Sequence, residues 1–164
     1  MRRLEHLALP LVAVLALAAC GKPATPEEPA SAPAPAASPE PAPVAAADWS
    51  SLDALADKYP SDTKLLEASA VTPTLEALLG AKFETLKTNM QTQSPLQRDG
   101  GVLYTSGNKQ HEGGTNMAYL LIDPKAKAVE VGLWEGGKLT VYKTDGAALA
   151  KPKDVQTMID NAAA

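Results

Sequence analysis

The sequence has one cysteine, Cys20, and two histidines, His6 and His111, among its 164 residues. A single cysteine cannot form an internal disulfide, and it excludes a cysteine-rich zinc site. His6 lies in the N-terminal leader described below, so the rest of the chain has one histidine and cannot build a two-histidine metal site. Most hydrolytic metalloenzymes are thereby excluded, and we expect neither a bound metal nor a catalytic cofactor.

Aromatic side chains and basic charge are also scarce. Aromatic residues make up 4% of the chain, and all of them occur from Trp49 onward. Fifteen of the thirty alanines and nine of the fourteen prolines precede Asp48, which divides the chain into a biased N-terminal segment and one domain, residues 48–164. From residue 48 onward 12 basic residues stand against 15 acidic residues. We expect no nucleic-acid partner, because phosphate neutralisation requires a clustered basic surface.

The first twenty residues have the features of a lipoprotein leader. Two arginines give a positive start, and the apolar run 7–17 is too short to remain as a membrane-spanning helix. The run ends in Leu-Ala-Ala-Cys, which resembles the lipobox of bacterial lipoproteins. The resemblance implies a signal peptide over residues 1–19 and a covalent lipid on Cys20. Gly21 in place of aspartate implies an outer-membrane lipoprotein that faces the periplasm. The alternative is an ordinary secretory signal with an unrelated cysteine.

Residues 20–47 form a tether that begins at the predicted acylated cysteine and is rich in proline, alanine and glutamate. The segment lacks the large apolar side chains that would offset the entropy of ordering, so we expect no packed structure in it. Proline stiffens such a chain toward polyproline II, and a tether of this length reaches up to about 80 Å. It would hold the domain away from the membrane.

The domain begins with helical patterns and continues with alternating ones. Apolar spacing and capping residues predict four helices, over residues 52–58, 73–79, 83–91 and 152–161. Alternation predicts four strands, over residues 102–106, 117–122, 129–134 and 139–143. Gly136-Gly137 is typical of a two-residue hairpin between the last two strands. The pattern predicts an α+β fold, with a central antiparallel β-sheet (a meander) and helices packed on one face.

Two groups of side chains have alternative interpretations. Asp123, Glu130 and Glu135 do not have the spacing of a calcium loop, and we expect them on the solvated edge of the sheet. Trp134 and Tyr142 are expected near one another across the hairpin. They are a core pair, or else part of a homodimer surface or a sugar-binding platform.

The connection between the first two predicted strands, residues 107–115, is longer than a hairpin requires. It contains His111, an adjacent acid, a preceding base and several glycines. Long connections in compact domains are usually functional or mobile. A hydrolase is disfavoured, because Ser106 near His111 is not surrounded by a G-x-S-x-G elbow. We therefore expect a binding loop and no enzymatic activity.

This loop resembles that of the Ivy family, periplasmic inhibitors of vertebrate c-type lysozyme. The family has a protruding loop C-K-P-H-D-C-G ahead of two strands of a central antiparallel sheet. Lys109-Gln110-His111-Glu112 stands where the family has K-P-H-D. Residues 117–142 follow the family's order of an apolar strand, a polar turn and a second apolar strand. The likeness covers roughly residues 60–145. By this resemblance the inhibitory loop comprises Asn108, Lys109, Gln110, His111, Glu112, Gly113 and Gly114.

The chain also departs from the family pattern. Asn108 and Gly113 replace the two loop cysteines, and Gln110 replaces the loop proline. The resemblance therefore implies a loop without the family's disulfide, which would be more costly to order on binding. Weaker inhibition, or a different target, follows as a hypothesis.

The resemblance implies a lysozyme-like muramidase as the partner. Such enzymes carry two carboxylates on either side of the scissile bond, and an imidazole inserted between them can hydrogen-bond to both. By this resemblance the expected target is a host c-type lysozyme, or a bacterial lytic transglycosylase or muramidase. The alternative, from a different class, is a tethered envelope module with an Ivy-like fold that binds another partner or serves structurally.

Overall fold

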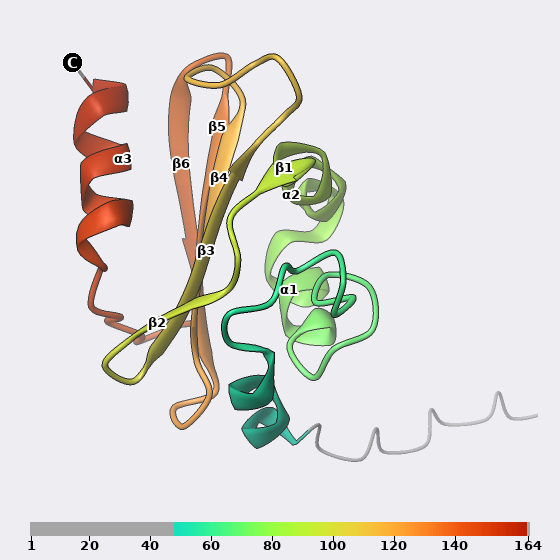
Figure 1. Cartoon of the computed structure of the whole chain (residues 1–164). Coiled ribbons are helices and arrows are strands. Elements are labelled where there is room, and N and C mark those ends of the chain that lie inside the picture. The colour runs from blue at the N-terminus through green and yellow to red at the C-terminus, as the bar shows by residue number, and fades with distance from the viewer. Residues whose placement is uncertain (1–47, 164) are drawn as a thin grey trace, which may run out of the picture. The chain divides into compact units, whose positions relative to one another are not determined.

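The computed structural model describes residues 48–163, so the predicted signal peptide, Cys20 and the tether lie outside the described residues. A six-stranded antiparallel sheet forms the centre of the domain (Figure 1). Its strands are β1 (Thr92–Gln93), β2 (Gln97–Asp99), β3 (Val102–Asn108), β4 (Met117–Asp123), β5 (Ala128–Glu135) and β6 (Lys138–Lys143). The α-helices are α1 (Thr72–Leu79), α2 (Phe83–Asn89) and α3 (Lys153–Ala163), and the 3-10 helices are η1 (Trp49–Leu55) and η2 (Gly80–Lys82).

The predicted α+β class and the antiparallel meander are confirmed. β3, β4, β5 and β6 are neighbours in the sheet in the same order as in the chain, and β4 lies in the interior. Glu135 pairs with Lys138 across the predicted hairpin, where Gly136 and Gly137 have φ of 61° and 81°. Both values lie in the left-handed region that glycine adopts without steric cost, which explains the two glycines.

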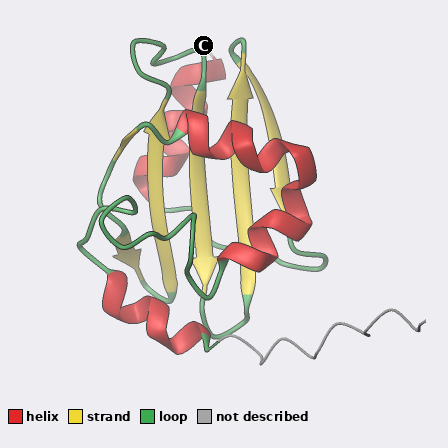
Figure 2. Ribbon diagram, turned by 90° about the vertical axis from the view of Figure 1, so that its right-hand side faces the viewer, coloured by secondary structure: helices red, strands yellow, loops and turns green. Residues whose placement is uncertain are grey.

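The prediction that the helices cover one face of the sheet is wrong. The helices α1 and α2 cover one face, and α3 covers the other (Figures 1 and 2). Successive residues of a strand point to opposite faces, so Leu120 joins the core under α1 and α2, while Leu121 joins the core under α3. β4 is apolar at successive positions and β5 is buried at successive positions, so both faces of the sheet are covered, and α3 supplies the second cover through Val155.

Trp134 and Tyr142 also differ from the prediction, because they lie on opposite faces of the sheet. The residue opposite Trp134 is Leu139, and the residue opposite Tyr142 is Val131. Trp134 packs edge-on against Tyr119 in the core under α3, with 5.9 Å between ring centroids, whereas Tyr142 packs against the other core. A cross-hairpin aromatic pair therefore does not form.

Glu130 is buried, contrary to the prediction of a solvated edge. It is 4% exposed, accepts a hydrogen bond from the Tyr119 hydroxyl at 2.8 Å, and pairs with the Lys151 ammonium at 2.8 Å. Burial, followed by the bond to Glu130, raises the pKa of Tyr119 and keeps its hydroxyl protonated. A buried carboxylate requires such partners, and Lys151 reaches it from the segment that leads into α3.

The N-terminal end of the domain lies at the opposite end of the sheet from the long loop (Figure 1). The first helix is the 3-10 helix η1 rather than the predicted α-helix over residues 52–58, and the Asp48 carboxylate caps it by accepting from the Ser50 N–H at 2.9 Å. Asp53 of η1 forms an ion pair with Arg98, which faces Leu103 at the start of β3. The long loop follows the other end of β3. Within residues 48–163, no helix has the length and hydropathy needed to cross a membrane.

Candidate functional site

The predicted binding loop is a folded structure that connects β3 to β4. Asn108 and Met117 are the last paired residues of the two strands. Beyond them, the Lys109 N–H donates to the Asn116 carbonyl at 2.9 Å and closes the base of the loop. The Glu112 N–H donates to the Lys109 carbonyl at 3.0 Å, and the Glu112 carbonyl accepts from the N–H groups of Thr115 and Asn116. These bonds give the loop internal backbone pairing without a disulfide.

The side chain of Glu112 points back into the loop. One carboxylate oxygen lies 2.5 Å from the Lys109 ammonium, and the other accepts a hydrogen bond from the Asn116 amide. These two contacts, with the bond from Lys109 the larger, lower the pKa of Glu112 below its ordinary value of 4.5. Lys109 and Glu112 therefore neutralise each other, and Glu112 makes no hydrogen bond to His111 within the described chain.

His111 is exposed at the tip of the loop. Its φ is 64°, in the left-handed region that is uncommon for a residue other than glycine and in which histidine is among the enriched types. The imidazole makes no hydrogen bond to any described residue. His111 thus occupies a backbone conformation that glycine would adopt with less strain. Backbone strain of this kind is frequent at binding sites.

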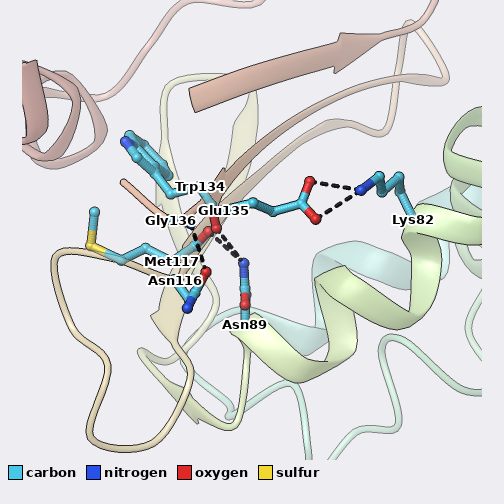
Figure 3. A network of polar contacts seen from close by, with 7 residues as sticks. All are labelled: Lys82, Asn89, Asn116, Met117, Trp134, Glu135 and Gly136. Carbon is cyan, nitrogen blue, oxygen red and sulfur yellow. Dashed lines mark hydrogen bonds and ion pairs between the residues drawn. The ribbon is translucent and has the colours of Figure 1, made fainter. Parts of the chain in front are cut away.

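The base of the loop is joined to the neighbouring hairpin. The Gly137 N–H donates to the Thr115 carbonyl at 2.8 Å, and the Gly136 N–H donates to the Asn116 side-chain oxygen at 3.1 Å. Figure 3 shows the second of these bonds beside the ion pair between Lys82 and Glu135, whose charged atoms are 2.7 Å apart. The loop and the β5–β6 hairpin therefore form one unit at this end of the sheet.

Asn89 supports this unit from the last turn of α2. Its side chain is 2% exposed, and the amide nitrogen donates to the Met117 carbonyl at 3.0 Å and to the Trp134 carbonyl at 2.9 Å (Figure 3). Asn89 thus bridges β4 and β5 where the loop and the hairpin begin. Neither Asn89 nor Asn116 was predicted from the sequence. A polar residue on the apolar face of α2, three residues after Leu86, was the available signal for Asn89.

A model of the Ivy family, described as inhibitor of vertebrate lysozyme, matches residues 70–164. The chain belongs to the Ivy family. The match confirms the resemblance seen in the sequence, and it contains the whole of the loop and all of β3 to β6. No curated protein and no solved structure gives a significant match. Lysozyme inhibition is the activity for which the family is named, and an inhibitor is not an enzyme.

The two positions at which other Ivy loops carry cysteine face each other in this structure. A Cβ atom built on Gly113 would lie 3.9 Å from the side-chain carbon Cγ of Asn108. The Asn108 amide donates to the Lys109 carbonyl at 2.8 Å, and the Gln110 N–H donates to the Gln91 side-chain oxygen at 3.3 Å. Proline in place of Gln110 could not make the second bond. One hydrogen bond therefore ties position 110 to Gln91, whereas the Asn108 amide bonds to its neighbour and does not link positions 108 and 113.

Neutralising Lys109 is expected to raise the pKa of Glu112. In Lys109→Met the carboxylate loses the largest contribution to its lowered pKa, so a carboxyl-carbon NMR titration should move the midpoint toward 4.5. In the wild type the folded pKa lies below the unfolded value, so the contact stabilises the loop above pH 4.5 and is lost as the pH falls through the lowered pKa. Lys138→Met, on an exposed residue of the adjacent hairpin, is the control. An unchanged Glu112 midpoint in Lys109→Met would contradict the assignment.

Proposed function

We propose that the protein is an envelope lipoprotein that inhibits a c-type lysozyme or related muramidase by inserting residues 108–114 into the catalytic cleft. Membership of the Ivy family supports lysozyme as the partner. The observation that carries the mechanism is His111, which is exposed at the tip of a loop whose base is hydrogen-bonded to the neighbouring hairpin. Such a loop presents one imidazole on a support that is hydrogen-bonded at its base, which lowers the ordering cost that the missing disulfide would otherwise add on binding.

The chemistry of the imidazole suits the proposed target. A retaining muramidase has two carboxyl groups about 5 Å apart, one protonated and one ionised. The imidazole of His111 can donate from one nitrogen and accept at the other, or donate from both when protonated. Each charge-assisted hydrogen bond contributes about 1.5–3 kcal/mol. Because Lys109 and Glu112 pair with each other, the exposed side chains of His111 and Gln110 remain available to the enzyme, and His111 alone of these can carry a charge.

The lipid anchor and the location form part of the same proposal. The lipobox-like sequence ending at Cys20 supports acylation of that cysteine, and Gly21 supports the outer membrane, with the domain facing the periplasm. Several acyl chains bind a membrane stably where a single chain binds reversibly, since burial of each CH₂ contributes about 0.8 kcal/mol. The protein would then meet lysozyme where the enzyme reaches peptidoglycan.

Replacing His111 is expected to weaken inhibition of c-type lysozyme at least tenfold. The preferred variant is His111→Asn, because asparagine tolerates the left-handed backbone and removes the imidazole. The measurement is the inhibition constant in a peptidoglycan lysis assay with the full-length protein.

The matched control is Gln110→Ala, which changes the adjacent side chain and retains the backbone bond to Gln91. An unchanged inhibition constant in His111→Asn would show that the imidazole is not the inhibitory group. Failure of the wild type to inhibit at high micromolar concentration would favour the alternative, a tethered Ivy-like module with another partner.

A further inference from the structure

A groove lies between α3 and the end of the sheet that carries the loop. It consists of two adjoining hollows with volumes of about 500 Å³ and about 340 Å³. Met117 of β4 and Met158 of α3 line both hollows and join them into one groove. Each volume is within the range of pockets that bind small ligands, about 300–1,000 Å³. The Met117–Met158 groove is therefore large enough to receive side chains of a partner.

The groove is continuous with the predicted inhibitory loop. Gly114, near the end of the loop, lines the larger hollow, and Asn108, at its start, lines the smaller hollow. A partner that encloses the loop must therefore bring its surface against the mouth of the groove. On the other side of the loop, toward α2, a hollow of about 320 Å³ is lined by polar and charged side chains, including Lys109, Asn116 and Glu135. The hollow on the α2 side has no apolar residue in its lining, whereas the groove on the α3 side contains two methionines.

The lining of the groove combines an apolar part, formed by two methionines and one alanine, with polar residues and glycine, which make up the rest of both hollows. Met117, Met158 and Ala162 are half-buried hydrophobic side chains that pack against the core under α3. Asp154 and Asn161 are exposed and line the larger hollow. An apolar centre with a polar rim is the usual anatomy of a protein–protein contact. Methionine has an unbranched, polarizable side chain that adapts its shape to an incoming group, which suits the binding of apolar side chains.

We infer that the Met117–Met158 groove binds apolar side chains from the rim of the catalytic cleft of the same lysozyme molecule that receives the loop. The inference rests on the proposed function and adds a second contact to it. Lysozyme is the partner that family membership supports, and the groove adjoins both ends of the loop that would enter its cleft. Because the lining on the α2 side of the loop is polar, the groove would also determine the orientation in which the enzyme binds to the loop.

The first test uses methionine methyl groups as reporters in the full-length protein. The chain has four methionines, of which Met90 is 3% exposed in the core and Met1 is the initiator. With ¹³C-labelled methionine methyl groups, addition of unlabelled c-type lysozyme should shift the NMR signals of Met117 and Met158 and leave that of Met90 in place. Unshifted Met117 and Met158 signals in the saturated complex would overturn the inference.

The second test compares two charge-matched variants of α3. Met158→Glu places a carboxylate in the groove and is expected to raise the Kd for c-type lysozyme at least tenfold, mainly through faster dissociation. Gln156→Glu adds the same charge at an exposed position outside the groove and should change the Kd less than twofold. Thermal unfolding of both variants shows whether the fold is retained. A Met158→Glu protein that binds as tightly as Gln156→Glu contradicts the inference.

The experiments distinguish an error in the groove inference from an error in the proposed inhibition by the loop. If His111→Asn loses affinity and Met158→Glu does not, the groove inference alone is wrong. If the wild type does not bind lysozyme, the proposed function is wrong and the inference falls with it. Met117 and Met158 signals that change with protein concentration in the absence of lysozyme would assign the groove to a second copy of the chain, which also overturns the inference.

Discussion

Gly132→Ala is expected to lower the free energy of unfolding by about 3 kcal/mol or more, which is at the upper end of the usual cost of overpacking. A Cβ atom on Gly132 would lie 2.1 Å from Cε1 of the Tyr119 ring, which is far inside van der Waals contact. The ring cannot move aside easily, because Tyr119 is fully buried, packs edge-on against Trp134 and donates its hydroxyl to Glu130. One methyl group therefore disturbs the core and a buried polar contact together.

The measurement is urea unfolding followed by tryptophan fluorescence, with near-ultraviolet circular dichroism to report on the Tyr119–Trp134 packing. Gly101→Ala is the matched control, because nothing lies within 4 Å of a Cβ at that position and its φ is not in the left-handed region. The control should be neutral or slightly stabilising, by about 0.4–1 kcal/mol. Equal stability of the two variants would mean that Tyr119 does not cover Gly132.

Asn89→Ala is expected to cost about 2–4 kcal/mol of stability and also to weaken lysozyme inhibition severalfold. The substitution removes two hydrogen bonds from a buried amide and leaves the carbonyls of Met117 and Trp134 without that donor. Both carbonyls lie where β4 and β5 lead into the loop and the hairpin. Loss of the bridge should therefore loosen the support of the loop as well as the core.

Denaturant unfolding and the inhibition constant, both measured where the variant is still folded, test this expectation. Thr88→Ala is the control on the same helix, since its hydroxyl donates only to the exposed Glu84 carbonyl. The control should change stability by less than 1 kcal/mol and leave inhibition intact. An Asn89→Ala protein with lower stability and full inhibition would show that Asn89 stabilises the core and does not support the loop.

Local patterns in the sequence were sufficient to predict much of the sheet. The hairpin at Gly136-Gly137, the strands on both sides of it and the long loop with His111 all follow from short-range signals such as glycine pairs and alternation. β1 and β2 were not predicted, because they are two and three residues long and pair with β3 through polar residues. Such strands depend on their partner and leave no alternating apolar pattern.

The residues whose environment was predicted wrongly, or not predicted, owe that environment to contacts between distant parts of the chain. Glu130 is buried because Lys151 and Tyr119 bind it, and neither partner is marked by sequence spacing. The cover on the second face of the sheet could have been predicted, since β4 is apolar at successive positions and a helical pattern follows the last strand at residues 152–161. The support of the loop by Asn89 could not have been predicted from the sequence. It depends on hydrogen bonds from an amide on α2 to two strands that are 28 and 45 residues away in the chain.

The opposite placement of η1 and the loop has a consequence for how the proposed lipoprotein would be oriented. The described chain begins at η1, which is joined to Arg98 beside the start of β3, and the loop with His111 follows the other end of that strand. A seven-residue strand spans about 20 Å, so about that distance separates the start of the described domain from the loop. In the proposed lipoprotein the tether would join the domain at the end of the sheet opposite the inhibitory loop. An enzyme could then be captured from the periplasm without competing with the lipid surface for the same side of the protein.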